Sequence, residues 1–478
     1  MKIGIVVDHY QRDLNGYLIL IDKLLLKNDF EIYLINLYHL YEIYLLDLDV
    51  IILQNSRPEN LYIIKDFKKL KKNIIIIDNE GVPFGWSKDE EHINQFIKNI
   101  KHSLNYIDAY VVWSNYIKNL IEKNKINTKK IYVLGNQRFE LFKKKFKYIF
   151  KKRITNKKVI VINTNTPNSN PQFTSKKKDR EDIKKKLFYD TENKDDLLSK
   201  TLIYNNIIYE NNLKFIENMI DDFKDYKIIL NVHPFEDKKI YKKLFGNKKN
   251  IIILNNNFHL PQLYNNYHFV IQYNSTTCAE TLFGGKKSIS INFIDPNNIL
   301  NKYYKDFCIN FDEYTKLKLF LKKYINLDNE IYKIENKTQE LLNYLYHNGS
   351  NDSLELISEL ISQTADKNQN EKINITKKYF FFLKYFLIFN YNKINIFILP
   401  ARILKLALIF VINSKNFYSL KLLFKKNYKK KHIELTHYNK FLKKLNKDSF
   451  NLKILYAKPL FFKAIFRSLI AIKISKIL

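Results

Sequence analysis

Two carboxylates, Asp78 and Glu80, stand in a short segment that also contains Gly81 and Pro83. This segment directly follows an apolar run of strand length, residues 73–77. Glycine and proline favour a tight loop, which would present the carboxylates at the end of the strand. A carboxylate in that position can take a proton from a hydroxyl group or attack an electrophilic carbon. We expect Glu80, and after it Asp78, to be catalytic; the alternative is a helix N-cap followed by an acid in the first turn.

A histidine and a proline follow a second apolar run, residues 226–232. In the sequence His233-Pro234-Phe235-Glu236, the proline restricts the backbone after the histidine. The imidazole should therefore lie at the exit of a strand rather than inside a helix. His233, Pro234 and Glu236 are candidate ligand-binding residues, and the family resemblance given below implies that their ligand is a nucleotide donor.

A cluster of hydroxyl and amide side chains follows the run 269–271. N–H groups at the start of a helix, together with Ser and Thr hydroxyls, bind anions such as phosphate. Glu280, one turn into that helix, could bind a ribose; the alternative is an ordinary capped helix. The expected donor-binding residues here are Gln272, Asn274, Ser275, Thr276, Thr277 and Glu280.

Two further polar segments also follow apolar runs. Asn163, Thr164 and Asn165 could bind a phosphate group through amides and hydroxyls, and they are expected donor ligands. Asn136 and Arg138 are expected to bind substrate, because a guanidinium group can make two parallel hydrogen bonds to a carboxylate or phosphate. The alternatives are an Asn-rich turn and a plain connection between domains.

The elements that must position these residues alternate between short β-branched runs and helical stretches. The alternation occurs twice, which predicts an α/β protein of GT-B-like architecture: two Rossmann-like domains facing a cleft, with ligands beyond the carboxyl ends of the strands. We expect a first domain over residues 1–150, on the acceptor side and carrying the catalytic carboxylate, and a second over 151–362, on the nucleotide-donor side. The expected strands are 3–7, 30–36, 49–54, 73–78, 109–113 and 131–134 in the first domain, and 158–163, 226–232, 250–254, 269–272 and 287–292 in the second.

The positive charge is concentrated near the C-terminal end of the sequence. The chain has 81 Lys and Arg against 48 Asp and Glu, and residues 371–478 contain 24 of the basic residues with 3 acidic ones. No apolar run there reaches the roughly 20 residues of a spanning helix. We therefore expect 363–478 to be a linker followed by a basic, mainly helical region that lies on an anionic membrane surface through 371–478. A solvated tail is the alternative. Nucleic-acid binding is disfavoured, because no RRM, KH, helix-turn-helix or zinc-finger pattern accompanies the charge.

Several classes of protein are excluded by what the sequence lacks. The two cysteines, Cys278 and Cys308, form neither a disulfide framework nor a zinc motif, which indicates a reducing compartment. The first residues contain no signal-peptide pattern, so we expect a cytoplasmic protein. There is no P-loop and no G-x-G-x-x-G, and we expect no metal site and no cofactor.

Taken in order, these motifs resemble the surface carbohydrate biosynthesis family of GT-B-like bacterial glycosyltransferases. The resemblance covers about residues 1–300 and also extends to transferases that use CMP-activated ulosonic acids such as Kdo. Its motifs are D-N-E-G at 78–81, G-N-x-R-F at 135–139, N-T-N and N-P within 163–171, H-P-x-E at 233–236 and N-S-T-T-x-x-E at 274–280.

The resemblance implies a metal-independent glycosyltransferase that moves a sugar from a nucleotide-sugar donor to a surface polysaccharide or lipid-linked glycan acceptor. Such an enzyme builds capsule or lipopolysaccharide as a peripheral protein on the inner face of the cytoplasmic membrane. By the same resemblance His233, Ser275 and Thr276 bind the donor phosphate and Glu280 the ribose. Asn231, where an arginine often precedes the His-Pro pair, departs from the pattern and affects the expected donor. The rival enzyme is a CDP-polyol phosphotransferase of teichoic-acid type, and the rival non-enzyme is a nucleic-acid-binding protein.

Overall fold

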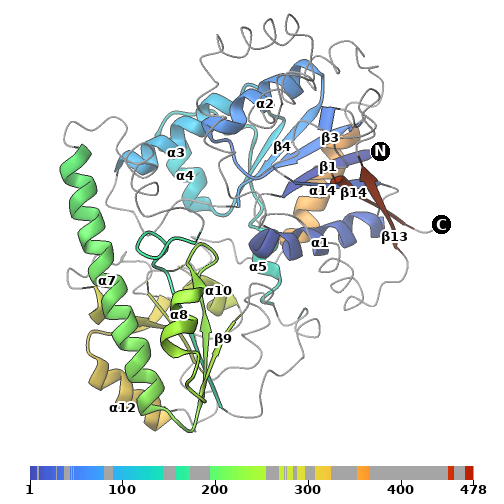
Figure 1. Cartoon of the computed structure of the whole chain (residues 1–478). Helices are drawn as coiled ribbons and strands as arrows, with labels where there is room; N and C mark the ends of the chain where they lie inside the picture. Colours follow the sequence, from blue (N-terminus) through green and yellow to red (C-terminus); the bar gives the residue numbers. More distant parts are fainter. Residues whose placement is uncertain are drawn as a thin grey trace, which may run out of the picture. The chain divides into compact units, whose positions relative to one another are not determined.

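A computed structural model describes a little over half of the chain, as two compact units that each contain a parallel sheet (Figure 1). The described residues are 1–7, 10–27, 30–36, 43–44, 46, 48–79, 90–143, 146, 158–172, 194–254, 269–273, 275, 277–283, 288–295, 307–324, 352–366, 450–456 and 469–476.

The first unit is built on six parallel strands in the order β2-β1-β3-β4-β5-β6. The strands are β1 (Lys2–Val7), β2 (Glu31–Asn36), β3 (Val50–Leu53), β4 (Asn73–Ile77), β5 (Ala109–Val112) and β6 (Ile131–Val133). The helices between them are α1 (Tyr10–Lys27), α2 (Pro58–Lys69), α3 (Glu90–Ser103), α4 (Asn115–Lys123) and α5 (Gln137–Glu140).

Continuous apolar runs place the central strands of this sheet in the interior. All four isoleucines of β4, residues 74–77, have no exposed surface, as expected for a strand covered on both faces. At the end of β5, Ser114 caps α4 by accepting a hydrogen bond from the Ile117 N–H at 3.4 Å. These features fix where each strand ends, and so fix the positions of the residues that follow.

A late helix, α14 (Ser353–Asp366), also belongs to the first unit. It packs against α1, α5, β3 and β4, and it buries Leu354, Ile357 and Ile361. The Asn73 side chain at the start of β4 donates to the Thr364 carbonyl at 2.7 Å. The expected second domain, 151–362, had included most of this helix. Its apolar periodicity predicted the helix, but periodicity does not specify which sheet the apolar face covers.

Two antiparallel strands extend the first sheet beyond β2. They are β13 (Phe450–Tyr456) and β14 (Leu469–Lys476), and β14 pairs with β2 through Ile474↔Ile32 and its neighbours. The expected mainly helical C-terminal region is thus wrong for these segments. The remaining residues of 367–478 lie outside the described part of the chain. Alternation of apolar and polar residues, as in Ile472-Lys473-Ile474-Ser475, is the period-two signal of a strand.

The second unit has six parallel strands in the order β12-β11-β10-β7-β8-β9. The strands are β7 (Val159–Asn163), β8 (Lys227–Asn231), β9 (Ile251–Ile253), β10 (Phe269–Gln272), β11 (Ser288–Ile291) and β12 (Cys308–Phe311). The helices are α7 (Lys194–Asp222), α8 (Lys238–Phe245), α10 (Thr277–Phe283), the 3-10 turn η4 (Asn292–Ile294) and α12 (Tyr314–Tyr324). Phe215 and Met219 of α7, with Phe223 directly after it, pack on the buried strands.

The strand order of the second sheet reverses direction between β7 and β10. The chain moves outward from β7 through β8 to β9, and it then continues on the other side of β7 with β10, β11 and β12. Such a reversal leaves a crevice at the carboxyl ends of the two inner strands, where open α/β sheets bind their ligands. The expected strands of both sheets are confirmed. The structure adds three strands that the sequence analysis does not expect, β12, β13 and β14.

Candidate functional site

The second unit brings three of the expected motifs to neighbouring strand ends. Asn163 ends β7, and it pairs in register with Asn231, which ends β8 two residues before His233. On the other side of β7, β10 ends at Gln272. The loops after β7, β8 and β10 therefore lie side by side along the carboxyl edge of the sheet, around the reversal point.

Hydrogen bonds join the loops after β7 and β8. The Asn231 amide donates to Asn163 Oδ1 at 2.9 Å, and the His233 N–H donates to Thr164 Oγ1 at 2.9 Å. The His233 imidazole is half-buried, and its Nδ1 accepts a hydrogen bond from the Phe235 N–H at 3.2 Å. Because Nδ1 is an acceptor, Nε2 carries the proton of the neutral ring. Nε2 can therefore donate to an anionic oxygen without the ring being charged.

Glu236, an expected donor ligand, is fully buried and holds the two loops in place. One carboxylate oxygen accepts from the Thr166 N–H at 2.6 Å, and the other accepts from the Tyr241 hydroxyl at 2.6 Å. Burial raises the pKa of Glu236, although these two hydrogen bonds act in the opposite direction. Both oxygens are thus occupied within the unit, which favours a positioning role.

The loop after β10 is held by a glutamine. Gln272 is buried, its Oε1 accepts from the Ser275 N–H at 2.9 Å, and its Nε2 donates to Cys308 Sγ at 3.3 Å. Ser275 is half-buried and caps the following turn, since its Oγ accepts from the Thr277 N–H at 3.3 Å. Glu280 is 4% exposed. Asn274 and Thr276 lie outside the described residues.

Two buried donors flank the reversal point and have no hydrogen-bond partner in the described part of the chain. They are Asn163 Nδ2, at the end of β7, and Thr277 Oγ1, after β10. Both residues are less than 10% exposed. Because leaving a buried polar group unpaired costs about 1–3 kcal/mol, such atoms indicate positions that a ligand oxygen can fill.

An acidic residue that the sequence analysis missed fixes the same loop. Asp295 follows η4 and is buried; it accepts hydrogen bonds from the hydroxyls of Tyr273, at 2.5 Å, and Tyr204 on α7. Burial, with Asp295 close by, raises the pKa of both tyrosines. A signal existed, because Asp295 follows an expected strand just as the other motifs do.

In the first unit, Asp78 lies in the interior. It is 3% exposed, and its carboxylate accepts from the Tyr110 hydroxyl at 2.8 Å. Its carbonyl accepts from the Trp113 indole N–H and from the Asn136 amide, the latter at 2.9 Å. These contacts favour a structural role for Asp78. Glu80, the first expected catalytic residue, lies outside the described residues.

Asn136 and Arg138 are also buried within the first unit. Gly135 has φ 77°, a backbone conformation that favours glycine, and it turns the chain into α5. Arg138 lies 3.8 Å from the Asp13 carboxylate and stacks 5.6 Å from the centre of the Trp113 ring. A Cβ atom on Gly16 of α1 would come within 3.0 Å of the Arg138 backbone. The G-N-x-R-F motif thus joins α5 to α1, and an interaction of Arg138 with substrate stays a prediction.

Comparisons with known proteins bear on the fold. The sequence matches no family model, and no curated protein sequence matches it significantly. A variant of the wall teichoic acid polymerase TagF aligns over 77% of this chain and 89% of its own, with 13% identity and a TM-score of 0.51. TagF soaked with CDPG for 15 minutes aligns over the same shares with a TM-score of 0.50. The UDP-GlcNAc 2-epimerase of Methanocaldococcus jannaschii, in complex with UDP-GlcNAc and UDP, covers 76% of this chain and 100% of its own, at 15% identity and a TM-score of 0.48.

The chain has a GT-B-like fold. This confirms the fold class expected from the two sets of alternating strands and helices. At 13% sequence identity, the structural likeness to TagF does not establish a substrate or a reaction for this chain.

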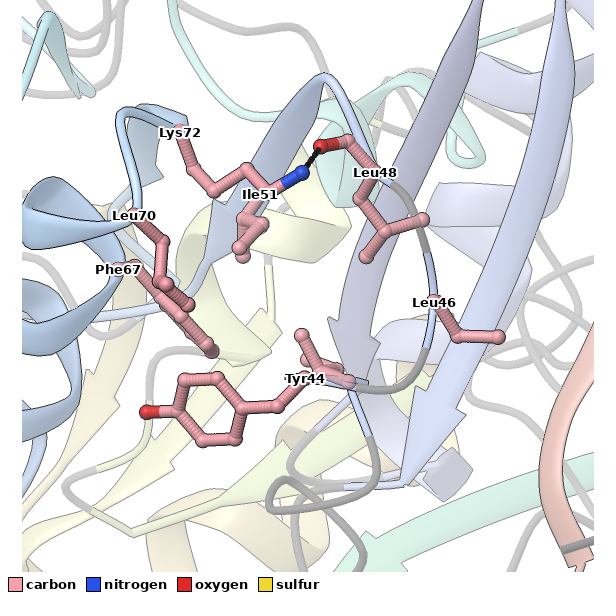
Figure 2. A pocket seen from close by; sticks show the side chains of 8 residues that line it. Tyr44, Leu46, Leu48, Ile51, Phe67, Leu70 and Lys72 are labelled. Carbon is pink, nitrogen blue, oxygen red and sulfur yellow. Dashed lines mark hydrogen bonds between the residues drawn. The ribbon is translucent and has the colours of Figure 1, made fainter. Parts of the chain in front are cut away.

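A small cavity in the first unit of this GT-B-like protein lies away from the strand-end motifs (Figure 2). Its volume is about 10 Å³, room for at most a single water molecule. Tyr44 and Phe67 line it with their rings 4.8 Å apart, and Lys72 donates to the Leu48 carbonyl at its rim. The cavity is a packing defect of the interior rather than a substrate site.

Neither metal ligands nor a membrane span is found in the described segments. Within them, no group of three or more His, Cys, Asp or Glu side chains is arranged to hold a metal ion. No helix among those residues is both long and apolar enough to cross a bilayer. The two cysteines, far apart in sequence, are buried neighbours, and burial together with Cys308 raises the pKa of the Cys278 thiol.

Proposed function

We propose that the protein is a glycosyltransferase that moves a sugar from a nucleotide-activated donor to a surface polysaccharide or a lipid-linked acceptor. The nucleotide phosphate binds at the carboxyl edge of the second sheet, around the reversal between β7 and β10. A CMP-linked ulosonic acid remains the first donor to test. The enzyme acts at the inner face of the cytoplasmic membrane, with residues 371–478 contributing to its attachment.

The observation that carries this proposal is the convergence of uncharged donors at three adjacent strand ends. The donors are His233 Nε2, the Ser275 hydroxyl and the two unpaired buried donors Asn163 Nδ2 and Thr277 Oγ1, and they lie at or shortly after the ends of strands that pair with one another. Donors held in advance around a leaving phosphate stabilise the charge that develops as the bond to the sugar breaks. Glu236, Gln272 and Asp295 hold the loops that carry those donors.

In the proposed reaction, the bond between the anomeric carbon and the phosphate oxygen breaks, and the nucleotide leaves. A carboxylate either takes the proton of the attacking acceptor hydroxyl or attacks the anomeric carbon itself. We keep Glu80 for this role, because the Asp78 carboxylate is buried and already bonded to Tyr110. Glu80→Gln should abolish transfer while leaving nucleotide affinity unchanged; wild-type turnover would remove Glu80 from the mechanism.

The donor site is tested by binding CMP, UDP, GDP and CDP-glycerol to the full chain by calorimetry. His233→Ala and Ser275→Ala should each weaken the best nucleotide by about tenfold, the usual order for losing a charge-assisted hydrogen bond. His102→Ala is the matched control, since His102 is an exposed histidine on α3 of the other unit. Equal affinities in all three variants would show that the nucleotide binds elsewhere.

A CDP-polyol phosphotransferase of teichoic-acid type is the second candidate. It is favoured by the fold likeness to TagF, with TM-scores of 0.51 and 0.50. Thermal stabilisation by CDP-glycerol, but not by CMP or nucleotide sugars, would favour this second candidate.

The proposal of nucleic-acid binding through the basic C-terminal region would gain support if removing that charge abolished salt-sensitive RNA binding and left vesicle binding intact.

A further inference from the structure

The outer surface of α8 combines lysines with aliphatic side chains. The helix buries Tyr241 and Phe245 in the core of the second unit. On its outward side Ile240 is 37% exposed and Leu244 49% exposed, one turn apart. Lys239, Lys242 and Lys243 are exposed beside them. We call these five outward residues, 239, 240 and 242–244, the α8 basic face (α8 is labelled in Figure 1).

The lysines of this face form no ion pair with a described acid, and the nearest acid in the sequence, Asp237, caps the helix by accepting from the Lys239 N–H at 3.0 Å. Residues 238–249 contain six lysines and no Asp or Glu. Lys238 donates to the Leu254 carbonyl at 3.0 Å, and Lys248 pairs with Asp221 at 3.2 Å. Lys239, Lys242, Lys243 and Lys249 form no ion pair with any residue that the structure describes. Three lysines of α8 without an ion pair, Lys239, Lys242 and Lys243, thus accompany two exposed aliphatic side chains on the same helix.

Another helix of the same unit, α12, has a weaker form of this arrangement. α12 also exposes a leucine, Leu319, and also carries four lysines. Two of those are paired: Lys316 lies 2.7 Å from Glu313, and Lys318 lies 2.6 Å from Asp222. Among the described residues, α12 thus keeps two lysines without an ion pair beside one exposed leucine, whereas α8 has three such lysines beside two exposed aliphatic side chains.

We propose that the α8 basic face binds an anionic membrane surface directly, with Ile240 and Leu244 entering the interface and the lysines contacting the headgroup phosphates. Long lysine side chains reach the headgroup level while aliphatic groups bury below it. A nucleic acid would also attract the lysines, but contacts to its phosphate backbone leave the aliphatic side chains without a partner. This site is separate from 371–478 and does not depend on which donor the enzyme uses.

The test measures binding of the full chain to vesicles by sedimentation. Vesicles of phosphatidylglycerol and phosphatidylcholine are compared with vesicles of phosphatidylcholine alone. The charge variant is Lys239→Gln/Lys242→Gln/Lys243→Gln, and its matched control is Lys316→Gln/Lys322→Gln/Lys323→Gln on α12, which changes the net charge equally. The apolar variant is Ile240→Ser/Leu244→Ser. All of these side chains are exposed, so circular dichroism should show unchanged folding.

The charge variant should lower the apparent partition onto anionic vesicles by at least about tenfold relative to the α12 control, because each lysine near an anionic surface contributes separately. The apolar variant should bind the same vesicles more weakly. Because it keeps the three lysines, its vesicle binding should still fall steeply as the salt concentration rises. Equal partition of the charge variant and the α12 control overturns the proposal. An apolar variant with wild-type vesicle binding, together with a charge variant that loses RNA binding, also overturns it and assigns the face to nucleic acid.

Discussion

Glu236 and Asp222 are carboxylates of the second unit whose surroundings shift their pKa values in opposite directions. Burial raises the pKa of Glu236, and its two internal hydrogen bonds only partly oppose that effect. Hydrogen bonds from Lys318 and Tyr314 lower the pKa of Asp222. A raised pKa means that the folded chain holds a proton that the unfolded chain releases, whereas a lowered pKa means the reverse. The two residues should therefore contribute to stability with opposite dependence on pH.

Replacing each of these two carboxylates by its amide tests that contrast. The contribution of Glu236 to the free energy of unfolding is fully present below its ordinary pKa of 4.5 and is lost as the pH rises through the raised value. Wild type should therefore lose stability relative to Glu236→Gln as the pH rises. The contribution of Asp222 is present above its ordinary pKa of 3.8 and is lost as the pH falls. The wild-type protein should therefore gain stability relative to Asp222→Asn as the pH rises. Urea denaturation over a pH series measures both, and parallel profiles for the two variants would contradict the assignment.

At the scale of elements, α7 makes two tyrosine–aspartate contacts of similar chemistry at different places. Near its N-terminal half, Tyr204 and Tyr273 both donate to Asp295, which fixes the loop after β10. At its C-terminal end, Asp222 accepts from the Tyr314 hydroxyl of α12 at 2.8 Å. Only the first contact includes a residue of a strand-end loop that carries proposed donor ligands.

Tyr273→Phe should therefore act on binding, and Tyr314→Phe only on stability. Each variant loses one hydrogen bond to a carboxylate and should be destabilised by about 1.5–3 kcal/mol. Tyr273→Phe should in addition weaken nucleotide affinity by about tenfold, because Ser275 and its neighbours lose their fixed geometry. Thermal melting and calorimetry on both variants separate the two effects. If Tyr273→Phe binds the nucleotide with unchanged affinity, the contact between Tyr273 and Asp295 has only a structural role.

At the scale of the whole molecule, the C-terminal residues do more than carry charge. β14 pairs with β2, so the backbone of β2 has a neighbour on each side. Removing this part of the chain would leave β2 as an exposed edge of a parallel sheet. An unpaired edge with apolar residues such as Ile32 and Leu34 is a template for association between chains.

A chain that ends at residue 366 should therefore self-associate, whatever its membrane affinity. Size-exclusion chromatography should show larger species and thermal melting a lower midpoint than in the full chain. The control keeps every residue and removes only charge, as Lys429→Gln/Lys430→Gln/Lys431→Gln, and it should elute like wild type. A monomeric truncated chain with an unchanged melting temperature would mean that β13 and β14 contribute little to the first unit.

Much of the fold could be read from the order of residues. Runs such as 74–77 and 159–162 are β-branched and continuous, which is the mark of a strand covered on both faces, and the helices between them specify parallel pairing. Because parallel strands present their carboxyl ends at one edge, the polar residues that follow β7, β8 and β10 could be expected to meet. The structure places those loops together.

Which of those polar residues face a ligand depended on packing between segments distant in sequence. Glu236, Asp78 and Arg138 have the residue types of a site, yet each is buried against a partner 32 to 125 residues away, which is Thr166, Tyr110 or Asp13 respectively. Asp295 follows an expected strand, but the tyrosines whose hydroxyls donate to it, Tyr204 and Tyr273, lie 91 and 22 residues away. The pairing of α14 with the first sheet and of β14 with β2 likewise joins residues hundreds of positions apart. Local periodicity fixes which face of an element is apolar, whereas the partner that covers this face is chosen by the packing of the whole unit.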